Sequence, residues 1–298
     1  MNQNTAPDTS IPVEPMVVDA HIHLWDLSVY TRRDWLQDKP QLIRNFLPAD
    51  AAEVFDSAAV THGIIVEAIK CSEADNVEWL NMSLTHPRIL GAVTGCCLDD
   101  PGLPDLLDRY AAWDSFLGVR ATPRRDVNDW GEIDAMSGSL ELLARRGITL
   151  EILAHPHDLP DVARMAAAFS ELTIVVDHCG LPDVESLRSG TWSAGIALLA
   201  PHHNISVKYS GLAMIGKGFG HCQFFATVAS TLFDVLGPTR LIAGSNWPVD
   251  SLWVDYGTAW NFGRGLLPDG LSAGERRMVY SENALRAYGI LTRAEAAE

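Results

Sequence analysis

The chain has 298 residues, of which 47% are hydrophobic and 20% are charged, and its formal net charge is −16 at pH 7. That length is ample for one large buried core and fits a single domain better than two. Binding to a nucleic-acid backbone needs clustered Lys and Arg, and only 22 such residues are spread along this acidic chain. A nucleic-acid partner is therefore not expected.

The termini and the cysteines indicate where the protein works. Residues 1–15 lack the apolar stretch and charged start of a secretory signal, so we expect a disordered tail, one domain over residues 16–290 and a short C-terminal tail over residues 291–298. No segment offers about 20 consecutive apolar residues, so no membrane span is expected. The five cysteines lack Cys-x-x-Cys spacing and are odd in number, which indicates reduced thiols. We expect a soluble, cytoplasmic protein.

Short apolar, β-branched runs recur along the chain with room for a helix between them. Eight of these runs are predicted strands: Met16–Ala20, Gly63–Ala68, Ile89–Gly95, Leu117–Arg120, Thr149–Leu153, Thr173–Asp177, Ile205–Lys208 and Arg240–Gly244. Helices are predicted at Ala49–Thr61, Asp75–Thr85, Ser139–Arg146, Leu159–Phe169 and Gln223–Leu236. Such alternation gives parallel strands joined by crossover helices. The predicted fold class is α/β, as a single closed (β/α)8 barrel, or TIM barrel.

Two segments interrupt this alternation. Asp26–Pro48 is too long for an ordinary strand-to-helix connection, so we expect it to fold over the strand ends. Met214–Cys222 is rich in glycine, which suits a mobile lid or a close approach of the backbone to a ligand. Both segments are predicted to border the mouth of the barrel and to influence substrate choice.

His21 and His23 follow the first apolar run. Two residues apart on a strand, they share a face, and inside a barrel that face is the lumen. Two imidazoles there can hold a metal ion or polarise a substrate oxygen. A lone His-x-His pair is as often structural, and Asp19 on the same strand is interpreted as a structural partner.

Polar residues also follow the sixth and eighth apolar runs. His178 comes directly after Asp177, and Asn246 comes shortly after Gly244. Barrel enzymes hold their reactive groups at the C-terminal ends of strands. Convergence of three strand ends on one mouth favours an active site over a purely capping role for His178.

Other side chains are predicted to contact a substrate. Arg120 ends an apolar strand and would be a fixed bidentate donor to a carboxylate or to a pair of hydroxyls. Lys208 and Ser210 share a face of the seventh strand, although Lys208 is equally well explained as the partner of a nearby carboxylate. The remaining predicted contacts are Glu67, His155, His157 and Trp25, and for Trp25 core packing is an equally ordinary explanation.

The order of motifs along the chain resembles the amidohydrolase-2 family. The motifs are His-x-His on the first strand, Asp-His-x-Gly-x-Pro from Asp177 to Pro182, Val-Lys-x-Ser-Gly-Leu from Val207 to Leu212, Gly-Ser-x-Trp-Pro-Val from Gly244 to Val249, and Asn283-Ala284. The resemblance spans about residues 17–290. It is nearest to the sugar-lactonase branch, with fuconolactonases and pyrone-dicarboxylate lactonases. It implies a hydrolase that opens a cyclic ester of a sugar acid or a pyrone-type molecule.

The resemblance also implies an eighth-strand Asp that takes a proton from water, but this chain has Asn246 there. An amide cannot take that proton at neutral pH. Asn246 is then a deliberate replacement or a natural divergence, or the base is another residue such as His178 or His155. His21, His23 and His178 would polarise the carbonyl directly or through one divalent metal, with zinc considered first, and no metal is required by the pattern.

Two other classes of function stay open. One is a lyase, cyclase or lactone isomerase on the same fold, in which Asn246 orients the substrate without acting as a base. The other is a small-molecule binding protein that has lost its base. The expected partner is a small-molecule lactone or a related carboxylate, and a homodimer is the commonest assembly for such enzymes.

Overall fold

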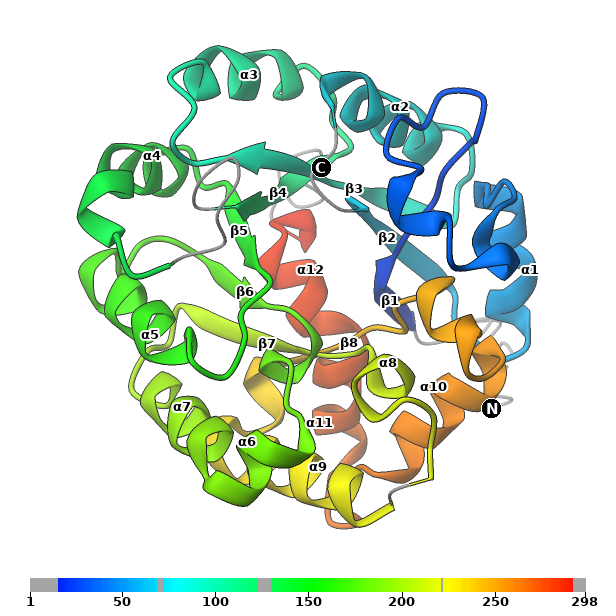
Figure 1. Ribbon diagram of the computed structural model, residues 1–298, viewed down its shortest axis with the longest axis vertical. Coiled ribbons are helices and arrows are strands. Elements are labelled where there is room, and N and C mark those ends of the chain that lie inside the picture. Colours follow the sequence, from blue (N-terminus) through cyan, green and yellow to red (C-terminus); the bar gives the residue numbers. More distant parts are fainter. Residues whose placement is uncertain (1–15, 69–71, 123–129, 221, 292–298) are drawn as a thin grey trace, which may run out of the picture.

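The computed structural model describes residues 16–68, 72–122, 130–220 and 222–291. Eight parallel strands form one sheet in the order β1-β2-β3-β4-β5-β6-β7-β8, with helices around it (Figure 1). The predicted single (β/α)8 barrel is confirmed, whereas the predicted tails, apart from Leu291, lie outside the described residues. The strands are β1 Val18–Ile22, β2 His62–Val66, β3 Ile89–Cys97, β4 Phe116–Thr122, β5 Thr149–Ile152, β6 Ile174–Val176, β7 Ile205–Tyr209 and β8 Leu241–Ala243.

Helices cover the outer face of the barrel (Figure 1). The α4 helix begins at Ile133, six residues before the predicted start at Ser139. The poor helix formers Ser137 and Gly138 hide its first turns in the sequence. The α-helices are α1 Pro48–Asp56, α2 Glu73–Leu84, α3 Leu103–Tyr110, α4 Ile133–Arg145, α5 Leu159–Ala168, α6 Val184–Ser189, α7 Thr191–Leu199, α8 Leu212–Gly216, α9 Cys222–Leu236, α10 Tyr256–Gly265, α11 Ala273–Arg277 and α12 Asn283–Ala287.

The barrel closes through residues that follow β1 and β8. His23 donates its backbone N–H to Trp247 O at 2.7 Å, and Asn246 donates its own to His21 O at 2.8 Å. These bonds satisfy backbone groups that an open sheet edge would leave unpaired. They also bring His21 of β1, and His23 just after it, next to Asn246.

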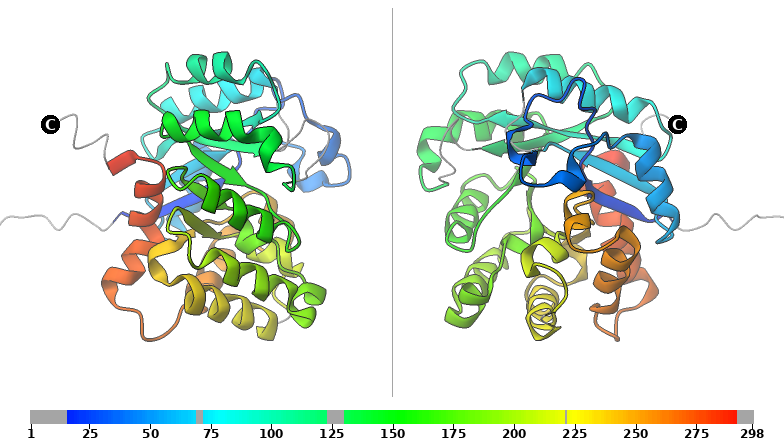
Figure 2. Two further views of the ribbon diagram at one scale, coloured as in Figure 1. Left: turned by 90° about the vertical axis from the view of Figure 1, so that its left-hand side faces the viewer. Right: turned by 45° about the vertical axis from the view of Figure 1, so that its right-hand side comes forward.

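The α12 helix closes the end of the barrel at which the strands begin. The two views of Figure 2 show this C-terminal part (red) beside the start of β1 (blue). Ala284, Leu285 and Tyr288 join an inner apolar cluster with strand residues such as Val18 and Ile242. This end of the barrel is therefore mainly a packed apolar core, and the active site is expected at the opposite end, where the strands end.

The predicted covering segment folds over the ends of β1 and β2. Its backbone pairs Trp25 with Phe46, and Tyr30 donates its hydroxyl to Ala68 O at 2.5 Å. The glycine-rich segment starts within α8 and reaches α9, although His221 lies outside the described residues. Among the described residues, no helix is long and apolar enough to cross a membrane.

Candidate active site

His21 and His23 meet inside the mouth of the barrel. The register between β1 and β2 shifts between Asp19 and Ile22. Such a bulge changes which side chains point into the barrel. Before it, the apolar Val18 and Ala20 face inward, and after it both histidines do. The two Nε2 atoms lie 3.2 Å apart. His23 Nδ1 lies 3.0 Å from Val66 O, which can only accept, so in the neutral ring Nδ1 holds the proton and Nε2 the lone pair.

Asn246 faces this pair from the end of β8. Its Oδ1 lies 3.1 Å from His23 Nε2, and its Nδ2 donates to Asp250 Oδ1 at 2.9 Å. Its φ of +63° is in the left-handed region, which Asn tolerates better than most residues. Because Nδ2 is held by a carboxylate, the amide presents its acceptor oxygen to the site.

A buried ion network lies beneath the histidines. Lys208 Nζ is 2.6 Å from Glu151 Oε1 and 3.1 Å from His21 Nδ1. Asp177 Oδ2 is 2.9 Å from Arg120 Nε, and its Oδ1 is 3.4 Å from His21 Nδ1. These five side chains are at most 6% exposed. An unpaired charge is very costly when buried, so each charged group here is expected to keep its partner. Because Lys208 and Asp177 both contact His21 Nδ1, the network also holds the imidazole of His21 in a fixed orientation.

Burial sets the protonation of the cluster. Burial, with positive charge nearby, lowers the pKa of His21 well below its ordinary value. Burial also lowers the pKa of His23 to about 4 and that of His178 to about 3. For Asp177, burial alone would raise the pKa, but its positive neighbours hold it well below its ordinary value. At neutral pH the site therefore combines three neutral imidazoles with an ionised carboxylate.

His178 joins the cluster from the end of β6. Its ring centroid lies 4.4 Å from that of His21, and its Nδ1 lies 3.0 Å from Ser210 Oγ. Two glycines make room for these rings. A Cβ on Gly211, whose φ is +63°, would lie 2.7 Å from His178 Nδ1, and a Cβ on Gly244 would lie 2.8 Å from His21 Cβ. The two imidazoles can therefore lie this close to the backbone only because Gly211 and Gly244 have no side chain.

A cavity of about 740 Å³ lies beside the network, at the C-terminal ends of β2 to β4. Arg120 and Glu67 belong both to its wall and to the network: Arg120 Nη1 donates to Glu67 O at 3.1 Å and lies 3.5 Å from the Glu67 carboxylate. Asn76, Tyr110 and Thr122 are also in the wall. A few polar groups on rigid strand ends suit a small hydroxylated or charged ligand.

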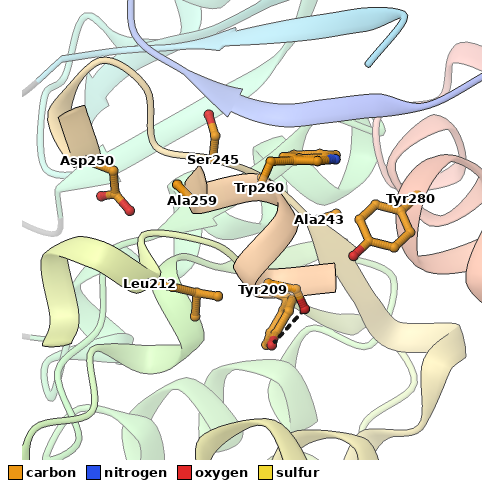
Figure 3. Close-up of a pocket in the computed structure, with 10 residues that line it drawn as sticks. Tyr209, Leu212, Ala243, Ser245, Asp250, Ala259, Trp260 and Tyr280 are labelled. Atoms are coloured by element: carbon orange, nitrogen blue, oxygen red, sulfur yellow. Dashed lines mark hydrogen bonds between the residues drawn. The ribbon is translucent and has the colours of Figure 1, made fainter. Parts of the chain in front are cut away.

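A much smaller cavity lies behind the end of β8 (Figure 3). Its volume of about 20 Å³ has room for about one water molecule. Trp260, Tyr280 and Tyr209 line it, and Tyr209 donates its hydroxyl to Gly263 O at 3.4 Å, the dashed line of Figure 3. It is too small for an organic substrate. The cavity of about 740 Å³ is the candidate ligand site, because Arg120 and Glu67 join its wall to the network beneath the histidines.

Three predicted substrate contacts lie elsewhere. His155 and His157 follow β5, are exposed and stack on each other with ring centroids 5.6 Å apart. Among the contacts described, none joins this pair to the histidine cluster. Trp25 is 1% exposed and packs against Tyr30 and Phe46, so it has a packing position rather than a place in the cavity wall.

Asp250 is a site residue that the sequence analysis did not single out. It is 3% exposed and contacts Asn246 directly. Its position four residues after Asn246 was the one available signal. Asp19 has the structural role expected of it, because its Oδ1 accepts from Ser245 N at 2.8 Å and ties β1 to the end of β8.

A barrel with clustered histidines at its strand ends is the usual arrangement of an enzyme active site. A family model described as amidohydrolase matches residues 18–290, and the chain belongs to that family. L-fucono-1,5-lactonase from Burkholderia ambifaria is 26% identical over 284 residues, which cover 92% of this chain and 95% of that protein. The expected family resemblance is confirmed.

Solved structures show the same fold. A zinc-bound amidohydrolase from Burkholderia multivorans has a TM-score of 0.81 at 24% identity, covering 92% of this chain and 99% of that one. A candidate 2-pyrone-4,6-dicarboxylic acid hydrolase from Pseudomonas putida has a TM-score of 0.73 at 22% identity, covering 93% of this chain and 98% of that one. At these identities the likeness concerns the barrel alone.

Proposed function

We propose that this chain opens a small lactone, of a sugar acid or a pyrone-type acid, by attack of water on the ester carbonyl. The observation that carries the proposal is the meeting of His21, His23, His178 and Asn246, from three strand ends, in one buried cluster. The polar cavity that Arg120 and Glu67 join to the network beneath this cluster, and the similarity to a sugar lactonase, support the same reaction.

His21 is suited to polarise the carbonyl. When Lys208 donates to His21 Nδ1, across 3.1 Å, the proton of the neutral ring is on Nε2, on the side of His23. This N–H is backed by a buried cation and points at the lone pair of His23 Nε2, so a carbonyl oxygen would bind it in place of His23. Such donors stabilise the oxyanion that forms as the carbonyl is attacked.

Asn246 would align the attacking water, and His178 would accept its proton. Asn246 Oδ1 accepts a hydrogen bond from the attacking water and aligns it, but it cannot take the proton. His178 is neutral, and although burial lowers its pKa, the negative charge of Asp177 opposes that lowering, so His178 is the candidate to accept the proton. A C–O bond to water then forms, the ring C–O bond breaks, and His178 returns its proton to the departing alkoxide.

The donor set also fits one divalent metal ion. His21, Asp177 and His178 offer ligand atoms within 4.8 Å of one another, and the imidazoles are in the neutral, ligating form. His21 and His178 would hold such an ion with Asp177, and His23, whose Nε2 lies 3.2 Å from that of His21, would be a further ligand. When bound, it would act as a Lewis acid on the carbonyl and acidify water.

Elemental analysis tests the metal. About one zinc per chain is expected in protein purified without chelators, and His23→Ala should lose it. Protein that binds no metal under these conditions, and is equally active after dialysis against a chelator, would exclude the metal from the proposal.

The reaction is tested by proton release with a panel of sugar and pyrone lactones. The parent chain should open at least one of them. His178→Ala should lose at least 100-fold in kcat, as removal of a general acid–base group does. His155→Ala is the matched control, because His155 is an exposed histidine outside the cluster, and it should stay within twofold of the parent. No turnover by the parent, or full activity of His178→Ala, contradicts the proposal.

A further inference from the structure

Asp250 stands behind Asn246, on the side away from His23. It lies in the short helix η5 Val249–Leu252 and is 3% exposed. Its Oδ1 accepts from Asn246 Nδ2 at 2.9 Å, and its Oδ2 accepts from the backbone N–H of Ala213 at 2.8 Å. Burial raises the pKa of this carboxyl to about 7, so above that pH it is ionised and can only accept, and both contacts then have a fixed direction.

The two contacts of Asn246 Nδ2 decide which end of the amide faces the site. Asp250 and the thioether sulfur of Met214, 3.6 Å away, are both acceptors, and both contact Nδ2. On the other side, Oδ1 lies 3.1 Å from His23 Nε2, and because that nitrogen holds a lone pair this contact alone would favour the reverse orientation, so the two contacts of Nδ2 decide against it. If the amide turned over, its oxygen would lie against the Asp250 carboxylate, with no proton between two acceptors.

We infer that Asp250 is a positioning residue that fixes the polarity of Asn246, so that the site is offered an acceptor oxygen instead of an N–H donor. The orientation itself follows from the contacts of Asp250. Its use, the alignment of water, rests on the proposed function. The orientation of Asn246 and its use in the reaction therefore need separate experiments.

Replacement of the carboxylate by an amide should reverse the polarity. In Asp250→Asn, the new Oδ1 accepts from Ala213 N–H, which leaves the new Nδ2 facing Asn246. Asn246 can accept from that donor only by turning over. Its own Nδ2 would then face His23, where the parent chain has an oxygen.

Exchange of the two groups should restore the acceptor. In Asn246→Asp/Asp250→Asn, the amide at 250 donates to the carboxylate at 246 and still accepts from Ala213 N–H. Every donor again has an acceptor. In Asn246→Asp alone, two carboxylates meet across the present 2.9 Å contact, so they repel each other or must share a proton. The single change is therefore expected to be a poorer enzyme than the exchange.

NMR tests the orientation without any substrate. With asparagine and histidine labelled in a deuterated chain at pH 8, the Asn246 side-chain NH2 should show no NOE to the His23 ring in the parent. In Asp250→Asn such an NOE should appear. Asp255→Asn, at an exposed aspartate that caps α10, is the matched control and should leave the spectrum of Asn246 unchanged. An unchanged amide in Asp250→Asn would overturn the inference.

Kinetics tests the use of the orientation. On a lactone that the parent opens, Asp250→Asn should lower kcat at least tenfold with KM within twofold, and the exchange variant should regain most of that loss. A merely structural role for Asp250 predicts no rescue, which would overturn the positioning role. If the amide turns over but no form opens any lactone, the inference about orientation stands and the proposed function fails.

Discussion

Lys208→Met is the perturbation whose effect on stability the structure defines most sharply. Lys208 and Glu151 are both fully buried, and their charges are 2.6 Å apart. At an effective dielectric constant near 20, their attraction is about 6 kcal/mol before desolvation is counted. Removal of one partner from a buried pair typically costs about 3–5 kcal/mol, and we expect a loss in that range.

The loss should depend on pH. Burial raises the pKa of Glu151 from 4.5 to about 7, against the opposing effect of Lys208. Without the lysine the folded pKa rises further, so the folded variant holds a proton that the folded parent releases above pH 7. A group whose folded pKa is raised in this way favours the unfolded chain once it ionises. The destabilisation should therefore be larger at pH 8.5 than at pH 6.

Urea unfolding at both pH values measures the effect. Lys208→Met/Glu151→Gln should recover at least half of the loss, because the unpaired charge is gone. Arg145→Met breaks an exposed ion pair with Glu141 and serves as the control, with no measurable change expected. A single variant as stable as the parent, or a double variant no better than the single one, would refute this reasoning.

Two further predictions concern the end of β8. Gly244→Ala places a Cβ 2.8 Å from His21 Cβ, so urea unfolding should show a loss of stability of about 1–3 kcal/mol, and activity should fall at least tenfold. The control is Gly138→Ala, at an exposed position of α4 with open space around it, which should be about 0.5–1 kcal/mol more stable than the parent. Equal stability of the two variants would contradict this. Burial raises the pKa of Asp250 from 3.8 to about 7, so the parent should lose stability relative to Asp250→Asn as pH rises from about 4 to 7, by at most about 4 kcal/mol. A pH-independent difference in unfolding free energy would count against this pKa.

The strands could be predicted from sequence because each is an apolar run, but the bounds of β1 could not. The predicted Met16–Ala20 begins and ends two residues before the observed Val18–Ile22. The polar His21 hid the end of the strand, and the bulge beside it depends on pairing with β2, which sequence alone does not show.

The site was predictable where motifs end strands and not where contacts cross the barrel. His21, His23 and His178 could be placed together because parallel strands bring their ends to one mouth. From the sequence, Lys208 could contact a substrate or pair with a carboxylate. The 2.6 Å contact between Lys208 Nζ and Glu151 Oε1 shows that it pairs with a carboxylate. Asp250 was missed because its importance comes from which end of Asn246 it holds. The homodimer and the substrate stay predictions.

The central claim, hydrolysis of a lactone, is tested most directly by turnover in water enriched in ¹⁸O. Hydrolysis by the parent chain predicts one ¹⁸O atom in the carboxylate of the hydroxy-acid product and one proton released per turnover. A product of unchanged mass, or one that has lost carbon dioxide, would contradict it, because isomerases and decarboxylases add no water to their substrates.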